Sequence, residues 1–180
     1  GPQREMLSES LREFVLQQGF GCQEHILQDL QKALLDQRRV IIEYQPPPAA
    51  APKAYEIDPY QMYFKRRALY LDAYCTETKD YRVFRLNRVA DVRFTDMGFT
   101  RHADYNFTER HRYSFSVFVG DTKQKVRVRF NKERAPYIRE ACWHRSQDLT
   151  DQPDGSLLFE VEVNEPREVG WWVLQWGADA

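Results

Sequence analysis

Cysteine is scarce in this sequence, and the short motifs that mark common catalytic sites are missing. Three cysteines lie far apart among 180 residues and form no Cys-x-x-Cys pair. This spacing argues against a disulfide framework or a zinc ribbon and favours the reducing cytoplasm as the protein's location. No Walker loop, Gly-x-Gly-x-x-Gly, His-Glu-x-x-His or Gly-x-Ser-x-Gly motif occurs, and these patterns hold phosphates, dinucleotides, zinc or a nucleophilic serine. We therefore expect no enzyme activity, no metal and no cofactor.

Long apolar runs and a strong net charge are missing too. No apolar run approaches the roughly 18 residues of a membrane span, and no signal peptide precedes the first predicted helix, so we expect no membrane partner. The formal net charge is −1, which excludes a general polyanion binder. The charge is uneven, however, because residues 38–101 carry 12 basic and 8 acidic side chains while both flanks are net acidic. Only a local patch could attract an anion.

Residues 1–37 are predicted to form linker helices, over 3–18 and 23–37. The second helix carries a leucine-rich stripe at three- and four-residue spacing, which is typical of a helix that packs on one face. A linker or dimer helix is the alternative. Gly1-Pro2 resembles the remnant of a protease-cleavage site, which predicts an excised fragment.

Residues 38–98 are predicted to form a small β-barrel. A strand over 40–44 is followed by the proline–alanine loop "QPPPAAAP", which cannot continue a strand. Short strands with tight polar turns between them then follow, and such spacing is typical of a small barrel. These strands are predicted over 54–58, 61–65, 68–75 and 81–86.

Residues 99–111 are predicted to be a linker, and 112–180 a second domain of the α+β class. Its elements are expected in the order β-β-α-β-α. They are two strands over 113–120 and 124–130, a helix over 131–144 with Asn131 as N-cap, a strand over 156–163 and a helix from Pro166 to Gly177.

Three arginines, Arg82, Arg85 and Arg88, lie in the predicted strand "YRVFRLNRV" and the turn after it. In an extended strand Arg82 shares a face with Phe84, whereas Arg85 lies on the opposite face. Lysine and arginine also precede this strand by one hairpin, and tyrosines surround it. These residues are Lys65, Arg66, Arg67, Tyr44, Tyr60, Tyr63, Tyr70 and Tyr74.

Arginine side chains bind phosphate oxygens in a bidentate manner, and aromatic ring faces stack on bases. The arginines and tyrosines therefore indicate a site for a short nucleic acid or a nucleotide. The structural alternative is that the arginines pair with Asp58, Asp72 and Asp91. From the residues alone both interpretations stay open.

A second basic stretch, "KQKVRVRF", alternates cations with other residues. Period two places its four cations on one face of a strand. This face is either a solvated outer surface or a ladder that follows a phosphate backbone, since adjacent like charges repel one another. The cations are Lys123, Lys125, Arg127 and Arg129.

The order of these motifs resembles the WYL domain of bacterial transcriptional regulators. The family pattern is a strand that ends in tyrosine, a proline-led strand, Trp-Tyr-Leu and Arg-x-Phe-Arg-Leu-Asp-Arg-Ile, and its counterparts are Tyr44, Pro59, residues 69–71 and residues 82–89. The stretch from "VRVRF" through "HRSQ" to "GWWVLQWG" resembles the WYL C-terminal extension, or WCX.

This resemblance implies an Sm-like, SH3-type barrel followed by a ferredoxin-like extension, acting as a ligand-sensing homodimer in the cytoplasm. The implied effector is a short single-stranded DNA or RNA, or a nucleotide, and promoter DNA would be bound by a separate helix-turn-helix domain. The implied pocket uses Tyr44, Tyr60, Arg82 and Arg88, supported by Arg85 and Tyr70. A purely structural dimerisation module and a sensor of a small molecule such as a cyclic nucleotide are the alternatives.

The sequence departs from the family pattern at three places. Leu69 stands where the family has its tryptophan, and the first hairpin carries the long proline–alanine loop. The family's closing strand has no counterpart between the last predicted helix and Ala180. Neither N-terminal helix presents a basic face, so we expect no DNA-reading helix within 3–37.

Overall fold

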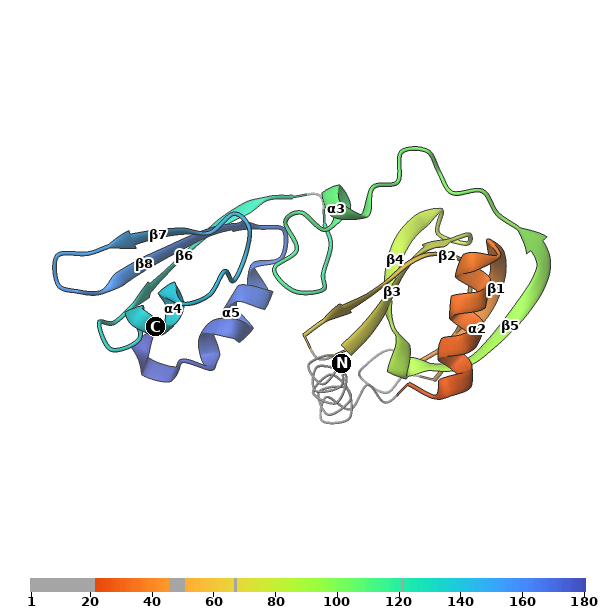
Figure 1. Cartoon of the computed structure of the whole chain (residues 1–180), viewed down its shortest axis with the longest axis horizontal. Coiled ribbons are helices and arrows are strands. Elements are labelled where there is room, and N and C mark those ends of the chain that lie inside the picture. The colour runs from red at the N-terminus through yellow and green to blue at the C-terminus, as the bar shows by residue number, and fades with distance from the viewer. Residues whose placement is uncertain (1–21, 46–50, 67, 121) are drawn as a thin grey trace, which may run out of the picture. The chain divides into compact units, whose positions relative to one another are not determined.

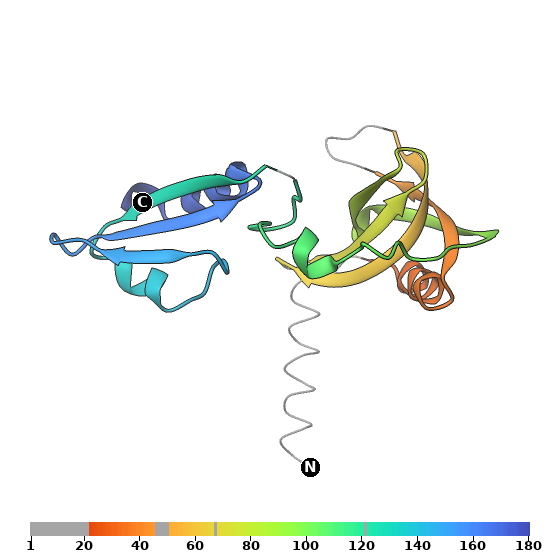
Figure 2. The ribbon, with the colours of Figure 1, turned by 90° about the horizontal axis from the view of Figure 1, so that it is seen from above.

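The computed structural model describes residues 22–45, 51–66, 68–120 and 122–180. The chain divides into two compact units, Gly1–Ala103 and Asp104–Ala180, each with its own sheet and helices (Figure 1, Figure 2). The mixed α+β class expected from the sequence is confirmed. The helix predicted over 3–18 and most of the proline–alanine loop lie outside the described residues. The predicted domain limits stay predictions.

The N-terminal unit is a five-stranded antiparallel sheet in the order β4-β3-β2-β1-β5. Its elements are α2 (Glu24–Leu35), β1 (Arg38–Tyr44), β2 (Lys53–Lys65), β3 (Ala68–Cys75), β4 (Asp80–Arg85), the 3-10 helix η1 (Leu86–Arg88) and β5 (Val89–Gly98). The predicted packing role of the leucine-rich helix is confirmed, because α2 buries Ile26, Leu30 and Ala33 in the core of this unit.

The sheet is strongly curled but does not close into a barrel. Within the described residues its edge strands β4 and β5 do not pair, because η1 carries the chain from β4 to the outer side of β1. In a flat sheet β1 and β4, three positions apart, would be separated by roughly 14 Å. Here the ring centroids of Tyr44 and Phe84 are 5.1 Å apart, and the Arg85 backbone N–H donates to the Tyr44 hydroxyl at 3.1 Å. Side-chain contacts thus take the place of ladder hydrogen bonds.

Two strands of this sheet differ from the prediction. The strands predicted over 54–58 and 61–65 are one continuous β2, with a bulge between Pro59 and Gln61. The bulge accommodates a proline that has no N–H for the ladder. β5 was not predicted, because most of its side chains are exposed and apolar residues do not alternate cleanly along it.

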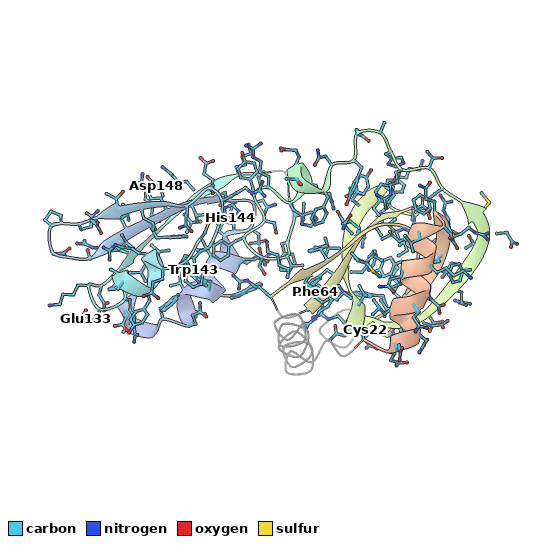
Figure 3. All side chains as sticks on the ribbon, in the orientation of Figure 1. Cys22, Phe64, Glu133, Trp143, His144 and Asp148 are labelled. Carbon is cyan, nitrogen blue, oxygen red and sulfur yellow. The ribbon has the colours of Figure 1, made fainter. Side chains whose placement is uncertain are left out.

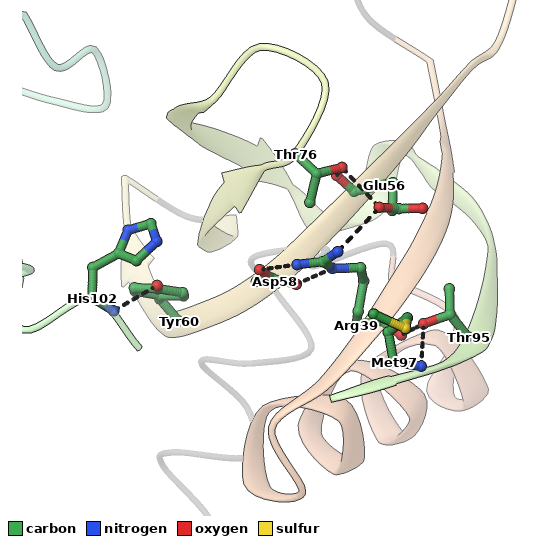
Figure 4. Close-up of polar contacts among 8 residues, drawn as sticks. All are labelled: Arg39, Glu56, Asp58, Tyr60, Thr76, Thr95, Met97 and His102. Atoms are coloured by element: carbon green, nitrogen blue, oxygen red, sulfur yellow. Dashed lines mark hydrogen bonds and ion pairs between the residues drawn. The ribbon is translucent and has the colours of Figure 1, made fainter. Parts of the chain in front are cut away.

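A bidentate ion pair ties β1 to β2. Arg39 Nε and Nη2 lie 2.7 and 2.9 Å from the two oxygens of Asp58, which is 4% exposed (Figure 4). The hydrogen bonds to Asp58 raise the pKa of Arg39 above its usual value. Glu56, 3.5 Å from the same guanidinium, accepts a hydrogen bond from the Thr76 hydroxyl at 2.9 Å. This network connects β1, β2 and the end of β3.

The C-terminal unit is a three-stranded antiparallel sheet in the order β6-β8-β7. Its elements are α3 (Phe107–Arg110), β6 (Gln124–Phe130), α4 (Ala135–Arg139), β7 (Asp148–Asp151), β8 (Leu157–Val163), α5 (Pro166–Leu174) and the 3-10 helix η2 (Gly177–Asp179). Trp172 of α5 is the centre of an aromatic core, with ring centroids 5.0 to 5.5 Å from four other rings. These rings belong to Phe115, Phe130, Trp143 and Phe159.

The strand predicted over 113–120 is wrong, because a buried carboxylate binds the backbone of this segment. Glu168, in the first turn of α5 and 2% exposed, accepts hydrogen bonds from the backbone N–H groups of Ser116, Val117 and Phe118 at 2.7 to 3.1 Å. These donors would otherwise face a neighbouring strand. The alternating apolar pattern here therefore reflects a loop folded over the start of α5.

The helix predicted over 131–144 is only the single helical stretch α4. The side-chain oxygen of Asn131 does accept the Arg134 N–H at 3.0 Å, as expected for a cap. After α4 the Gln147 side chain accepts the backbone N–H groups of Trp143 and His144, both labelled in Figure 3. These two hydrogen bonds hold the turn that leads into β7, a strand that was not predicted.

We expect Glu168→Gln to destabilise the C-terminal unit by about 2 kcal/mol, because the new amide N–H group must face a backbone donor in a buried site. All four tryptophans lie in this unit, so urea unfolding followed by tryptophan fluorescence measures its stability alone. Glu140→Gln, on an exposed residue, is the matched control. An unchanged midpoint for Glu168→Gln would contradict the role of this carboxylate.

We expect Asp58→Asn to destabilise the N-terminal unit by about 2 kcal/mol, since the guanidinium of Arg39 loses its charged acceptor. Hydrogen–deuterium exchange of the β1 and β2 amides should become faster. Asp91→Asn is the control, because Asp91 forms only a solvent-exposed pair with Arg93 at 3.6 Å. Equal exchange rates in the two variants would argue against the Arg39–Asp58 pair as the tie between the strands.

Candidate anion-binding site

Three aromatic rings pack together on the inner face of the curled sheet. Tyr44 of β1, Tyr55 of β2 and Phe84 of β4 meet edge to face, with centroids 5.1 to 6.2 Å apart. Edge-to-face contacts are a favoured geometry for aromatic pairs. The three residues, which we call the aromatic cluster, belong to the hydrophobic core of the N-terminal unit.

Two cations lie over one ring of the aromatic cluster. The Lys53 Nζ atom is 5.0 Å and the Arg82 Cζ atom 5.6 Å from the centroid of the Tyr55 ring. Lys53 begins β2 opposite Tyr44, and Arg82 lies on β4 two residues before Phe84. A ring face attracts cations, so Tyr55 positions both charges while the two basic side chains remain exposed.

Arg88 lies near the C-terminal end of β1, where Tyr44 pairs with Lys53. Its carbonyl oxygen accepts the Gln45 N–H at 2.9 Å, and the next residue, Val89, pairs with Tyr44. The structure thus brings Arg82 to the aromatic cluster that contains Tyr44, and it places the backbone of Arg88 beside Gln45, the residue after Tyr44. We call the aromatic cluster, the Lys53 and Arg82 side chains over its Tyr55 ring, and Arg88 the basic site.

The cations of the basic site form no ion pair within the part of the chain that the structure describes. Two of the three aspartates named in the structural alternative contact other arginines. Asp58 binds Arg39, and Asp91 lies 3.6 Å from Arg93. For Asp58 and Asp91, pairing with the arginines after Tyr81 is therefore not observed.

Arg85 and Tyr70 lie on the opposite face of the sheet. They are paired across β3 and β4, and the Tyr70 ring stacks on Tyr63 with centroids 5.7 Å apart. The Nε atom of Arg85 is buried without a hydrogen-bond partner. Leu69, at the position of the family's tryptophan, is 7% exposed and packs in the core.

Tyr60 and Lys65, also predicted for the site, lie elsewhere on β2. Tyr60 is fully buried, its ring stacks on Phe99, and its hydroxyl accepts the His102 N–H at 2.9 Å (Figure 4). Lys65 is the last residue of β2, opposite Ala68 in the hairpin to β3. The residues after Gly98, predicted as a linker, thus begin by packing on the N-terminal unit.

Sequence reasoning missed Lys53 and Tyr55. The one available signal was the alternation in "KAYEI", which places both side chains on one face of a strand. Their contact with Arg82 depends on the curl of the sheet, which no local pattern predicts.

The second basic stretch has its own acidic partners. On β6, Lys125 and Arg127 both bind Glu160 of β8, at 3.2 and 2.6 Å, and Arg129 binds Asp154 at 2.8 Å. The hydrogen bond from Arg127, followed by that from Lys125, lowers the pKa of Glu160. The Lys123 ammonium lies 4.0 Å from the centre of the Tyr113 ring. These contacts favour the interpretation as an outer sheet face over a phosphate-binding ladder.

The described residues offer neither a metal site nor a membrane-spanning helix. They contain no group of three or more histidine, cysteine or acidic side chains placed to hold a metal ion. Among them, no helix is long and apolar enough to cross a membrane.

The chain matches two protein-family models and is similar to solved structures. The WYL domain matches residues 25–94 and the WCX domain residues 122–180. Proteasome accessory factor B/C (PafBC) of Arthrobacter aurescens is similar at 19% identity and a TM-score of 0.40, over 85% of this chain and 23% of that chain. The chain therefore spans less than a quarter of PafBC. The curated proteins include no match. The chain therefore carries a WYL domain followed by a WCX domain.

Proposed function

We propose that this chain is the ligand-sensing regulatory region of a WYL-type transcriptional regulator. Its effector is a short single-stranded nucleic acid or a nucleotide, bound at the basic site. The observation that carries the proposal is that some cations of the chain bind an acidic side chain and others do not. Arg39, Arg127 and Arg134 each bind an acid, whereas Lys53, Arg82 and Arg88 have no ion-pair partner among the described residues. Adjacent cations without acids attract an anion.

The regulatory step that we propose is a change in dimer geometry. The chain acts as a homodimer, and a separate helix-turn-helix domain binds promoter DNA. An effector changes the DNA affinity only if it binds one dimer geometry more tightly than the other. The cations that bind the effector lie on β2, β4 and η1, so an effector that bridges them favours the more tightly curled sheet.

We expect labelled single-stranded DNA or RNA to bind the 180-residue chain with a log–log salt slope of roughly −2, as three phosphate contacts predict. Arg82→Ala should weaken binding about tenfold and make the slope less steep by about 0.7. Fluorescence anisotropy across a salt series measures both quantities.

Arg127→Ala, which removes a cation already bound to Glu160, is the matched control and should leave binding unchanged. Binding that is lost in Arg127→Ala and kept in Arg82→Ala would place the site on β6 instead. Binding of a cyclic nucleotide without binding of any strand would favour the small-molecule sensor. Absence of both would favour a structural dimerisation module.

A further inference from the structure

At the basic site the cationic side chains of Lys53 and Arg82 are exposed, whereas the rings of the aromatic cluster are buried. Tyr44, Tyr55 and Phe84 are 8%, 9% and 2% exposed, because each ring packs edge-on against the other two. Lys53 and Arg82 lie over the Tyr55 ring. A base can stack only on an exposed ring face. The base stacking expected from the tyrosine-rich sequence therefore has no surface at this site.

The buried aliphatic residues of the same core offer nothing for reading the edges of bases. They include Leu69, Leu86 and Val89. Aliphatic side chains provide no hydrogen bond to a base edge, which is the contact that carries sequence information. Phosphate, in contrast, is suited to the exposed groups: arginine binds it through a planar fork and lysine as a point charge.

We infer that the basic site binds the phosphodiester backbone of a single strand and does not read its bases. This inference rests on the proposed function and narrows its effector to oligonucleotides of any sequence. Lys53 and Arg82 are at most 10.6 Å apart, the sum of their distances from the Tyr55 centroid. This separation allows the two cations to contact phosphates of one strand. Lys53, which the family pattern does not include, is a phosphate-binding residue of this chain.

The test compares four labelled strands of equal length with the 180-residue chain: oligo(dT), oligo(dA), oligo(dC) and an abasic strand. We expect dissociation constants within about threefold of one another, because each stacked base typically contributes roughly five- to 150-fold in affinity. A strand with bases that binds more than about tenfold tighter than the abasic strand overturns the inference but leaves the proposed function intact. If no strand binds, the proposed function fails, and the inference fails with it.

Lys53→Gln tests the new residue. This substitution should weaken the binding of all four strands by the same factor, about five- to tenfold. It should also make the salt slope of binding less steep by about 0.7. Lys53→Arg should retain binding, and Lys79→Gln, an exposed lysine of the β3–β4 turn, should change nothing. A Lys53→Gln variant that binds as the parent does, or that loses affinity only for strands with bases, overturns the assignment.

Discussion

The contact between Tyr44 and Phe84 is the constraint on which the basic site depends. β1 and β4 share no ladder hydrogen bonds, yet their rings touch and the Arg85 backbone donates to the Tyr44 hydroxyl. This contact folds β4 over the inner face of the sheet. Arg82 then lies over a ring of β2, although β3 separates the two strands. The packing of the hydrophobic core thus determines where the charge of Arg82 lies.

The distribution of the acidic side chains decides where positive charge remains. The whole chain is nearly neutral, and a uniform mixture of charges would leave no site for an anion. Instead, the buried Asp58 binds Arg39, and the buried Glu168 binds backbone N–H groups of the C-terminal unit. Both carboxylates have structural roles far along the chain from the arginines after Tyr81. Within the N-terminal unit, Asp58 and Asp91 lie against Arg39 and Arg93 and so do not neutralise the basic site.

Local periodicity predicted the parts of the structure that depend on neighbouring residues. It placed Arg82 and Arg85 on opposite faces of one strand, and it located α2 and the proline-led start of α5. It failed where a distant side chain determines the backbone. The segment 113–120 alternates like a strand, but its N–H groups bind Glu168, about fifty residues away in the sequence. The family resemblance placed Tyr60 in the pocket, and only its packing against Phe99 and its hydrogen bond from the His102 N–H reveal that it is buried.

The cations on β6 also bear on how copies of the protein behave toward one another. β6 is an edge strand of its sheet, and an exposed edge can pair with a strand of another molecule. Two copies of β6 that met edge to edge would bring Lys125, Arg127 and Arg129 of each close together. Repulsion between these like charges opposes such pairing. The charges that resemble a phosphate ladder thus protect the protein against aggregation through its sheet edge.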